Sequence, residues 1–305
     1  MKKLILILTA FLIICPKSFA NTDDIALLEK SGFFTPLVQE SCLSSPMEEV
    51  KKTLYLHLRY ANNCNLEGLQ SLYADNYTNA DGLSKAIYFD LIKKTWENYP
   101  DIKYRIDIKN VEISGDNAIV QVDESALATT DSKSSVVNEK GLLESISDSV
   151  YYLEKINNKW LITSDHILFE KTSLRYGTAR TIDVNLTAPC QVSADNSYTV
   201  SLKINPPKDS LVIASIGKEN ITYPQTVAEE IFRKLPEDGL LERMFKSNNK
   251  NINEYAVASF GITKAEISKG MEIKVYVTGL GFVMSRVNVI PKNDFVKVAD
   301  NEKTK

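Results

Sequence analysis

The stretch Ile102-Lys103-Tyr104-Arg105-Ile106-Asp107-Ile108 alternates apolar and charged side chains along its whole length. Successive side chains on a strand point to opposite faces of a sheet, so this pattern predicts a strand with one buried face. Gly115-Asp116-Asn117 follows, and these residue types favour a tight hairpin turn. The sequence therefore predicts that residues 102–127 begin an antiparallel sheet.

The segments that follow extend this sheet. Residues 150–156 and 159–169 have the composition of strands, and Asn157-Asn158 predicts a tight turn between them. Residues 129–140 are polar and are predicted as a loop. We therefore expect a meander of four long antiparallel strands.

Helical patterns precede the strands. Ser45-Pro46-Met47-Glu48 has the pattern of a capping box with proline at the first helical position, and residues 46–62 repeat apolar side chains at helical spacing. Asn65 is expected to cap a shorter helix, and a third helix is predicted over 84–98. Helices followed by a run of strands indicate an α+β fold, with the helices on one face of a curved sheet.

The pattern changes after Gly177. Short predicted strands separated by turn residues are typical of an all-β sandwich, and a second capping box at 226–229 predicts a helical insertion over 225–246. The expected fold class is therefore a helix-backed curved antiparallel sheet followed by a β-sandwich with a helical insertion. The expected division is a signal peptide over 1–20, an α+β domain over 21–177, a sandwich domain over 178–293 and a disordered tail over 294–305.

The first residues have the pattern of a secretory signal. Lys2 and Lys3 precede an apolar stretch over 4–14, and Ser18-Phe19-Ala20 places small residues where a signal peptidase cleaves. The apolar stretch is shorter than the roughly 20 residues that cross a bilayer. We therefore expect cleavage near Ala20 and an exported protein, periplasmic or extracellular, without a membrane span.

The composition limits the partners of the chain. Its 305 residues include 44% hydrophobic residues, which is enough for packed cores, and its formal net charge is −3. Loss of residues 1–20 would remove three lysines and make the chain more acidic. Because a general nucleic-acid binder carries a basic surface, we expect no nucleic-acid partner.

Three cysteines follow residue 20: Cys42, Cys64 and Cys190. Export permits disulfides, and an odd count leaves one thiol unpaired or intermolecular. The helix predicted over 46–62 separates Cys42 from Cys64, whereas a disulfide needs Cα atoms within about 7 Å. We therefore favour a bridge from Cys190 to Cys64 or to Cys42, with three free thiols as the open alternative.

The stretch Leu56-His57-Leu58-Arg59-Tyr60-Ala61-Asn62-Asn63, with residues 69–77, resembles the opening of the nuclear transport factor 2-like superfamily. Gly115-Asp116-Asn117-Ala118 and Asn158-Lys159-Trp160-Leu161-Ile162 add to this resemblance, which covers residues 46–176. The superfamily includes ketosteroid isomerases, polyketide cyclases and many domains that only bind. The resemblance implies a cone of three helices on a bent sheet, with a pocket between them. Residues 178–293 resemble an immunoglobulin-like sandwich in architecture alone.

A catalytic member of this superfamily would hold a carboxylate or histidine inside the cone as a base, against a tyrosine or protonated aspartate that stabilises an oxyanion. The resemblance places Asp75 and Asp81 near the turn that carries the base in a ketosteroid-isomerase-like enzyme. Tyr60 and Tyr88 are the candidate hydroxyl donors.

Two further candidates follow from the alternation of the strands. Asp123 shares the strand parity of Ile119, and His166 shares that of Trp160, so both are candidates to face the pocket. Each candidate also has an ordinary explanation, because aspartates are common in turns and a histidine at a strand end often only forms a hydrogen bond.

The chain lacks the motifs of other chemistries. It has 2 His and no CxxC pair, so we expect no protein-built metal site, and it has no Walker loop, GxSxG or GxGxxG, so we expect no cofactor. The function favoured is an exported, non-enzymatic binding or envelope-associated protein whose partner is a protein or a small apolar ligand. The alternatives are an isomerase or cyclase with its site in the cone, and a dimerisation module that forms a homodimer.

Overall fold

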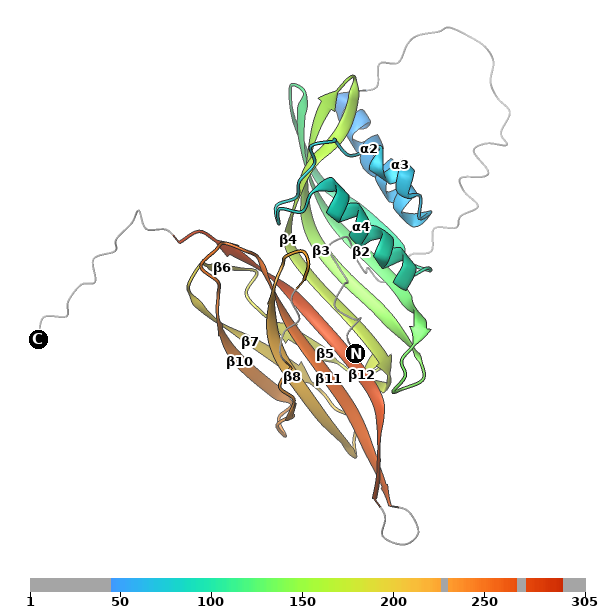
Figure 1. The fold of residues 1–305 in the computed structure, drawn as a ribbon, viewed down its shortest axis with the longest axis vertical. Helices are drawn as coiled ribbons and strands as arrows, with labels where there is room; N and C mark the ends of the chain where they lie inside the picture. Colours follow the sequence, from blue (N-terminus) through green and yellow to red (C-terminus); the bar gives the residue numbers. More distant parts are fainter. Residues whose placement is uncertain (1–44, 226–229, 268–272, 293–305) are drawn as a thin grey trace, which may run out of the picture.

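The computed structural model describes residues 45–225, 230–267 and 273–292. Three α-helices and a run of long strands make up its first part. These elements are α2 (Pro46–Asn62), α3 (Leu66–Gln70), α4 (Lys85–Asn98), β1 (Lys103–Ser114), β2 (Asn117–Lys133), β3 (Lys140–Ile156) and β4 (Lys159–Gly177). Figure 1 shows the three helices lying against one side of this part of the sheet.

The second part consists of strands and one short 3-10 helix (Thr178–Arg180). The strands are β5 (Val184–Thr187), β6 (Gln191–Ser193), β7 (Ser197–Ile204), β8 (Ser210–Asn220), β9 (Arg233–Lys234), β10 (Leu240–Lys246), β11 (Glu254–Ile267) and β12 (Ile273–Ile290). Among the described residues, no helix is both long and apolar enough to cross a membrane.

The expected fold class is wrong. The chain is mostly β, with 56% strand and 16% helix, and it is not a helix-backed α+β cone followed by a separate sandwich. One sheet of nine strands runs through both parts, in the order β1-β2-β3-β4-β12-β11-β8-β9, with β6 paired to β12. A second sheet has the order β10-β7-β5.

The length of β4 explains this difference. The sequence predicted a strand that ends at Phe169, but β4 continues to Gly177, and its last seven residues pair with Gly279–Ser285 of β12. Residues 171–175 of β4 pair with β3 on one side, and their other side is an edge on which another strand can add. The second part of the chain therefore continues the sheet of the first part.

The expected helical insertion over 225–246 is also wrong. Residues 230–246 contain β9 and β10 and no helix, and the capping-box pattern at 226–229 lies outside the described residues. β10 pairs along its whole length with β7, from Leu240 opposite Lys203 to Lys246 opposite Ser197. Pairing with a distant strand therefore outweighs the local helical pattern.

Two hydrophobic cores lie on opposite faces of the large sheet. On β12, Phe282 packs against the core under the helices and pairs with Leu174, which belongs to that core. The next residue, Val283, belongs to the other core, with Ala258 and Ile216. Because neighbouring side chains on a strand point to opposite faces, the helices and the three-stranded sheet cover opposite faces of the large sheet.

The helix expected over 46–62 is confirmed as α2, which begins with a capping box between Ser45 and Glu48. Glu49, in the first turn, accepts hydrogen bonds from Lys155 Nζ at 2.8 Å and Trp160 Nε1 at 3.2 Å. These bonds fasten α2 to the hairpin between β3 and β4. They hold the buried face of α2, which carries His57, over the sheet.

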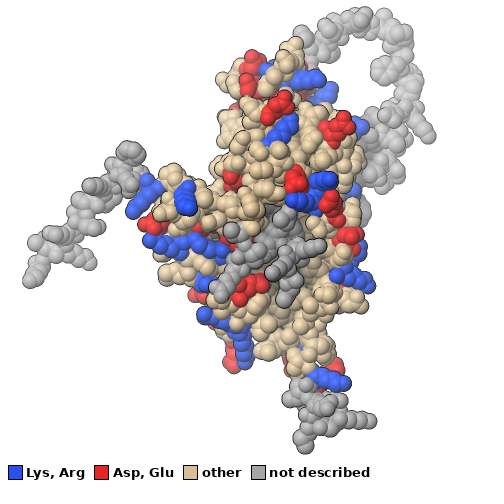
Figure 2. Space-filling model, viewed as in Figure 1, with Lys and Arg blue, Asp and Glu red and all other residues tan. Residues whose placement is uncertain are grey.

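Charged side chains of both signs are scattered over the face of the molecule drawn in Figure 2. No single sign of charge dominates that face, so the electrostatic interactions of this protein are local.

Candidate functional site

Seven polar side chains meet between the helices and the sheet, and we call them the interior cluster. They are His57 of α2, Tyr73 and Tyr77 of the loop after α3, Tyr88 of α4, Glu124 of β2, Tyr151 of β3 and Asp165 of β4. All seven are buried. Buried polar groups cost free energy unless they are hydrogen-bonded, so the partners of each group decide what it can do.

His57 and two tyrosines form one arm of the interior cluster. The His57 Nε2 atom lies 2.8 Å from the Tyr73 hydroxyl, which lies 3.5 Å from the Tyr88 hydroxyl. Burial lowers the pKa of His57 to about 3, so the imidazole is neutral at physiological pH. A neutral histidine can orient a hydroxyl group but does not stabilise a neighbouring anion as an imidazolium would.

The two carboxyl groups of the interior cluster each accept a hydrogen bond from a tyrosine. Tyr151 donates to Glu124 at 2.8 Å, and Tyr77 donates to Asp165. Burial raises the pKa of Glu124 well above its ordinary value and raises the pKa of Asp165 to about 6. Both carboxyl groups therefore hold a proton more strongly than exposed ones.

A second group of buried ionisable residues joins the two parts of the chain, and we call it the junction cluster: Asp81, Glu170, Tyr255 and Arg286. The Arg286 guanidinium bonds Asp81, in the loop before α4, at 2.5 Å. Tyr255 of β11 donates to Glu170 of β4 at 2.8 Å. Burial raises the pKa of Glu170 to about 7, although the nearby Arg286 lowers it.

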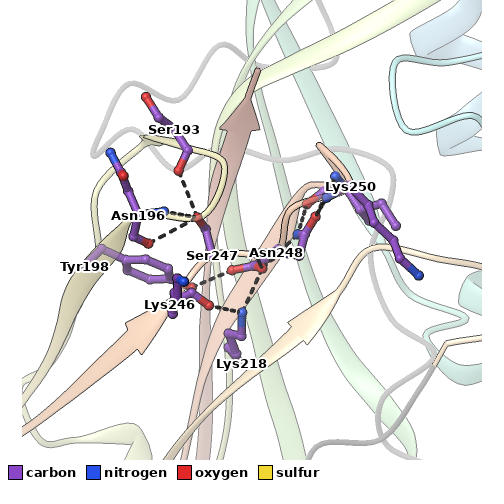
Figure 3. Close-up of polar contacts among 10 residues, drawn as sticks. Ser193, Asn196, Tyr198, Lys218, Lys246, Ser247, Asn248 and Lys250 are labelled. Carbon is purple, nitrogen blue, oxygen red and sulfur yellow. Dashed lines mark hydrogen bonds and ion pairs between the residues drawn. The ribbon is translucent and has the colours of Figure 1, made fainter. Parts of the chain in front are cut away.

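Another buried carboxylate, Glu254, lies in the second part. Glu254 accepts hydrogen bonds at 2.8 Å from Tyr198 of β7, Lys218 of β8 and Asn248 of the loop before β11. Figure 3 shows these three side chains converging from different elements. Burial opposes ionisation here, but the hydrogen bonds prevail and lower the pKa of Glu254. Glu254 is thus an ionised anchor that ties three elements together.

The structure separates the residues that the sequence singled out for the pocket. Tyr88 belongs to the interior cluster, whereas Asp75 is exposed and pairs with Lys85 at 3.2 Å. Asp123 lies on the opposite face of the sheet, where Lys109 bonds it at 2.5 Å. Tyr60 is half-buried at the edge of the helix-side core.

His166 also lies outside the interior cluster, and two bulges in β4 explain why. Ile162 opposes Leu153 and Ser164 opposes Tyr152, so Thr163 is an extra residue that reverses the alternation. Asp165 therefore points inward while His166 is half-buried on the other face.

A second bulge, further along β4, restores the alternation of inward and outward side chains that β4 has before Thr163. Ile167 opposes Ser149 and Phe169 opposes Asp148, so the residue between them is extra. Glu170 therefore points inward and reaches the junction cluster. Without the two bulges, β4 would not present Asp165 and Glu170 on the same face.

Sequence reasoning missed both carboxyl groups of the interior cluster. On β2, Val120 and Val122 are buried under the helices and Ile119 is exposed. Glu124, two residues after Val122, therefore also points inward. The run of small apolar residues at even positions of β2 was the available signal for Glu124. The bulges that turn Asp165 inward leave no comparable signal in the sequence.

Cys64 and Cys190 are exposed, free thiols, and Cys42 lies outside the described residues. Within the described ranges, no group of three or more His, Cys, Asp or Glu side chains is arranged to hold a metal ion.

A shallow pocket of about 370 Å³ lies on the exposed side of α2, away from the buried clusters. Its lining residues all belong to α2, and they are Glu48, Lys51, Lys52, Tyr55, Leu56 and Arg59. This pocket contains none of the buried carboxyl groups.

No protein-family model and no curated protein matches the chain. Solved structures match part of it. Bd1075 of Bdellovibrio bacteriovorus is 12% identical, with a TM-score of 0.32, and the match covers 39% of this chain and only 39% of that one. A conserved protein from Planctomyces limnophilus is 13% identical over 39% of this chain and 91% of its own, with a TM-score of 0.34.

An NTF2-like protein from Cytophaga hutchinsonii is 12% identical over 40% of this chain and 96% of its own, with a TM-score of 0.31. The structural neighbours thus include proteins described as NTF2-like.

Proposed function

We propose that the protein is an exported, non-enzymatic binding protein. The observation that carries this proposal is that the buried carboxyl groups of Glu124, Asp165 and Glu170 each accept a hydrogen bond from a tyrosine of the same chain. A general acid or base must reach the proton of its substrate within about 3 Å. The hydrogen bonds of these groups inside the core favour a role in stabilising the fold.

Export is supported by the pattern of residues 1–20, which lie outside the described part of the chain. The carboxyl groups of Glu124, Asp165 and Glu170 are buried, which favours a function carried out by the surface of the molecule. Binding is therefore the activity that best fits the arrangement.

The test is to purify the chain from the cells that produce it and to measure its mass by light scattering after size exclusion. We expect a stoichiometric complex that forms equally well with Asp165→Asn and Glu124→Gln variants of normal melting temperature. A chain that elutes alone would refute the proposal, as would a well-folded Asp165→Asn variant that no longer forms the complex.

One observation favours the second candidate, an acid–base enzyme acting on a small apolar ligand. Asp165, with a pKa of about 6, lies in the same cluster as the Tyr73 and Tyr88 hydroxyls, and that combination could transfer a proton. The test is a titration with 2-naphthol, followed by NMR of labelled tyrosine. Saturable shifts of Tyr88 that disappear in Asp165→Asn would show that a small apolar ligand reaches the interior cluster, which the enzyme requires.

A further inference from the structure

The ion pair between Arg286 and Asp81 is buried where the two parts of the chain meet. The two side chains are 0% and 3% exposed, and the Arg286 Nη2 atom lies 2.5 Å from Asp81 Oδ1. Asn253, in the loop before β11, donates to the same aspartate oxygen at 2.7 Å. Two side chains of the second part therefore hold the loop before α4 through one carboxylate.

The guanidinium of Arg286 is also fixed from its own strand. Its Nε atom donates to Asn288 Oδ1 at 2.8 Å, and Asn288 donates to the Leu168 carbonyl of β4 at 2.8 Å. Its remaining nitrogen, Nη1, is buried and has no hydrogen-bond partner in the described part of the chain. A buried N–H without a partner costs free energy, so an acceptor that reaches Nη1 is bound favourably.

Glu170 is the carboxyl group placed to become that acceptor. Ser285 of β12 pairs with Lys171 of β4, so Arg286 and Glu170 occupy the next position along the same two strands. Tyr255 of β11 lies opposite Arg286 and donates to Glu170 at 2.8 Å. Among the described residues, Glu170 accepts this bond and shares no hydrogen bond with Arg286.

The groups that face Glu170 come from each element packed around it. Arg286 of β12, Tyr255 of β11 and Asp81 of the loop before α4 all interact with its charge. On β3, the residue opposite Glu170 is Ser147, which does not titrate in this range. Arg286 is the one cation among these groups, so its choice of partner decides the charge balance of the junction cluster.

Protons decide how many carboxylates compete for the guanidinium. Burial raises the pKa of Glu170 to about 7 and that of Asp165, on the same strand, to about 6. While both groups hold a proton, the guanidinium balances the charge of Asp81 alone. Once Glu170 ionises, a buried carboxylate lies beside a buried N–H, and its charge is costly unless the two groups meet.

We propose that the junction cluster is a pH-dependent switch, in which Arg286 bonds Asp81 alone while Glu170 is protonated and also bonds Glu170 through Nη1 once that carboxyl group ionises. The added contact draws the guanidinium toward β4 and weakens its bond to Asp81. The loop before α4 then keeps its bond to Asn253 but loses part of its bond to Arg286, so it opens more often. The switch is independent of the binding function proposed above.

The direction of the switch follows from the tighter binding of the Glu170 proton in the folded protein. The loop is fully held at low pH, and the hold weakens as the pH rises through about 7. Asp165 contributes in the same direction at about pH 6.

NMR of the isotope-labelled full chain between pH 5 and pH 8 tests the switch. We expect the Glu170 carboxyl carbon and the Arg286 Nη1 protons to shift together, with one midpoint at about pH 7. Relative to free arginine, the Nη1 protons should exchange with solvent about 10-fold more slowly above the midpoint, because they gain an acceptor. The backbone amides of residues 80–83 should show stronger relaxation dispersion at pH 8 than at pH 5.

Three variants assign these changes. Glu170→Gln should abolish the change of the Nη1 protons at about pH 7, and Glu97→Gln, at an exposed position of α4, is the matched control and should behave as the wild type. Tyr255→Phe removes a hydrogen bond that lowers the pKa of Glu170, so it should move the midpoint to higher pH. This shift is expected even if Glu170→Gln fails to fold.

Nη1 signals that stay constant between pH 5 and pH 8, or that change in the same way in Glu170→Gln, would overturn the switch. A change of Arg286 that leaves the amides of residues 80–83 unaffected would overturn it as well, because Asp81 would then be held equally at both pH values. A midpoint at about pH 6 that disappears in Asp165→Asn would assign the titration to Asp165 and refute the role of Glu170.

Discussion

Besides Tyr198 and Glu254, three buried tyrosine–carboxyl pairs join elements of the structure at the scale of single residues. In each pair, the two residues come from different elements: Tyr151 of β3 and Glu124 of β2, Tyr77 and Asp165 of β4, and Tyr255 of β11 and Glu170 of β4. Leaving a buried carboxyl group without its hydrogen-bond partner costs about 1–3 kcal/mol. These pairs therefore stabilise the packing of the elements that carry them.

Tyr77→Phe tests this role. The substitution keeps the aromatic ring but removes the hydrogen bond that lowers the pKa of Asp165, so this pKa should rise above about 6. The free energy of unfolding should fall by about 1–3 kcal/mol at pH 8, where Asp165 is ionised, and by less at pH 5. Urea denaturation at both pH values measures the loss. Tyr55→Phe, at an exposed position on α2, is the control, and an equal loss in both variants would contradict this role.

At this scale, the least predictable feature was the face of the sheet to which each side chain points. The alternation of β1 was correctly expected from residues 102–108, because an unbroken strand carries its periodicity in the sequence. The parity of Asp123 was misjudged, and that of His166 was reversed by the bulge at Thr163. A bulge depends on how two strands pair, so the sequence of one strand does not specify it.

At the scale of elements, long strands govern the structure. β2, β3 and β4 contain 17, 17 and 19 residues, and β12 contains 18. Side chains on paired strands must fit beside each other, and the pair of β11 and β12 gives an example. Phe260 opposes Gly281, and its ring lies over the position where a side chain of residue 281 would stand. A glycine on β12 therefore allows a large side chain of β11 to fill the sandwich core.

Gly281→Ala should destabilise the pairing of β11 with β12. A Cβ atom at residue 281 would lie 2.1 Å from the Phe260 ring, which is too close unless the ring or the strand moves. We expect a loss of roughly 1–3 kcal/mol in the free energy of unfolding, measured by thermal or urea denaturation. Gly261→Ala is the matched control, because its Cβ would meet only ordinary contacts at 3.7 Å. A Gly281→Ala variant as stable as the control would show that the ring adjusts freely.

The elements with local signals were the ones that sequence analysis identified correctly. The capping box of α2 and the helix α4 depend on residues close together in the chain. β10 had no such signal, because its pairing with β7 joins residues that are far apart in the sequence. The helical pattern of residues 225–246 was therefore misleading.

At the scale of the whole molecule, the junction cluster links the helix-side loop to β4, β11 and β12. Arg286 is buried close to Asp81, Asp165 and Glu170. One guanidinium cannot balance three ionised carboxylates in a buried site, since desolvated charges without partners are costly. Glu170 and Asp165 therefore bind protons more tightly than exposed carboxyl groups, and the stability of the molecule should depend on pH.

The sign of this dependence follows from the pKa of Glu170, which is raised from 4.5 to about 7. The folded protein binds this proton more tightly than the unfolded chain, so the stabilisation is complete below pH 4.5 and is lost as the pH rises through about 7. Asp165, with a pKa of about 6, acts in the same direction, whereas His57 opposes it below about pH 6.5.

Glu170→Gln isolates the contribution of Glu170. The difference in unfolding free energy between the wild type and this variant should decrease by up to about 3 kcal/mol from pH 4.5 to pH 8, because glutamine does not titrate. Urea denaturation across this range measures the difference, with Glu97→Gln, at an exposed position, as the control. Parallel stability profiles for the wild type and Glu170→Gln would show that Glu170 does not titrate in this range.

The sequence by itself determined the features that depend on neighbouring residues: the helix over 46–62, the alternating strand from residue 102 and the hairpin turn at Gly115-Asp116-Asn117. Only the tertiary structure decided that β4 pairs with β12, which makes one large sheet and buries Arg286 beside Asp81. Caps, turns and periodicity act over a few residues, whereas strand pairing brings together segments about a hundred residues apart. The energies that select such partners come from the assembled sheet and its two cores, which no single stretch of sequence contains.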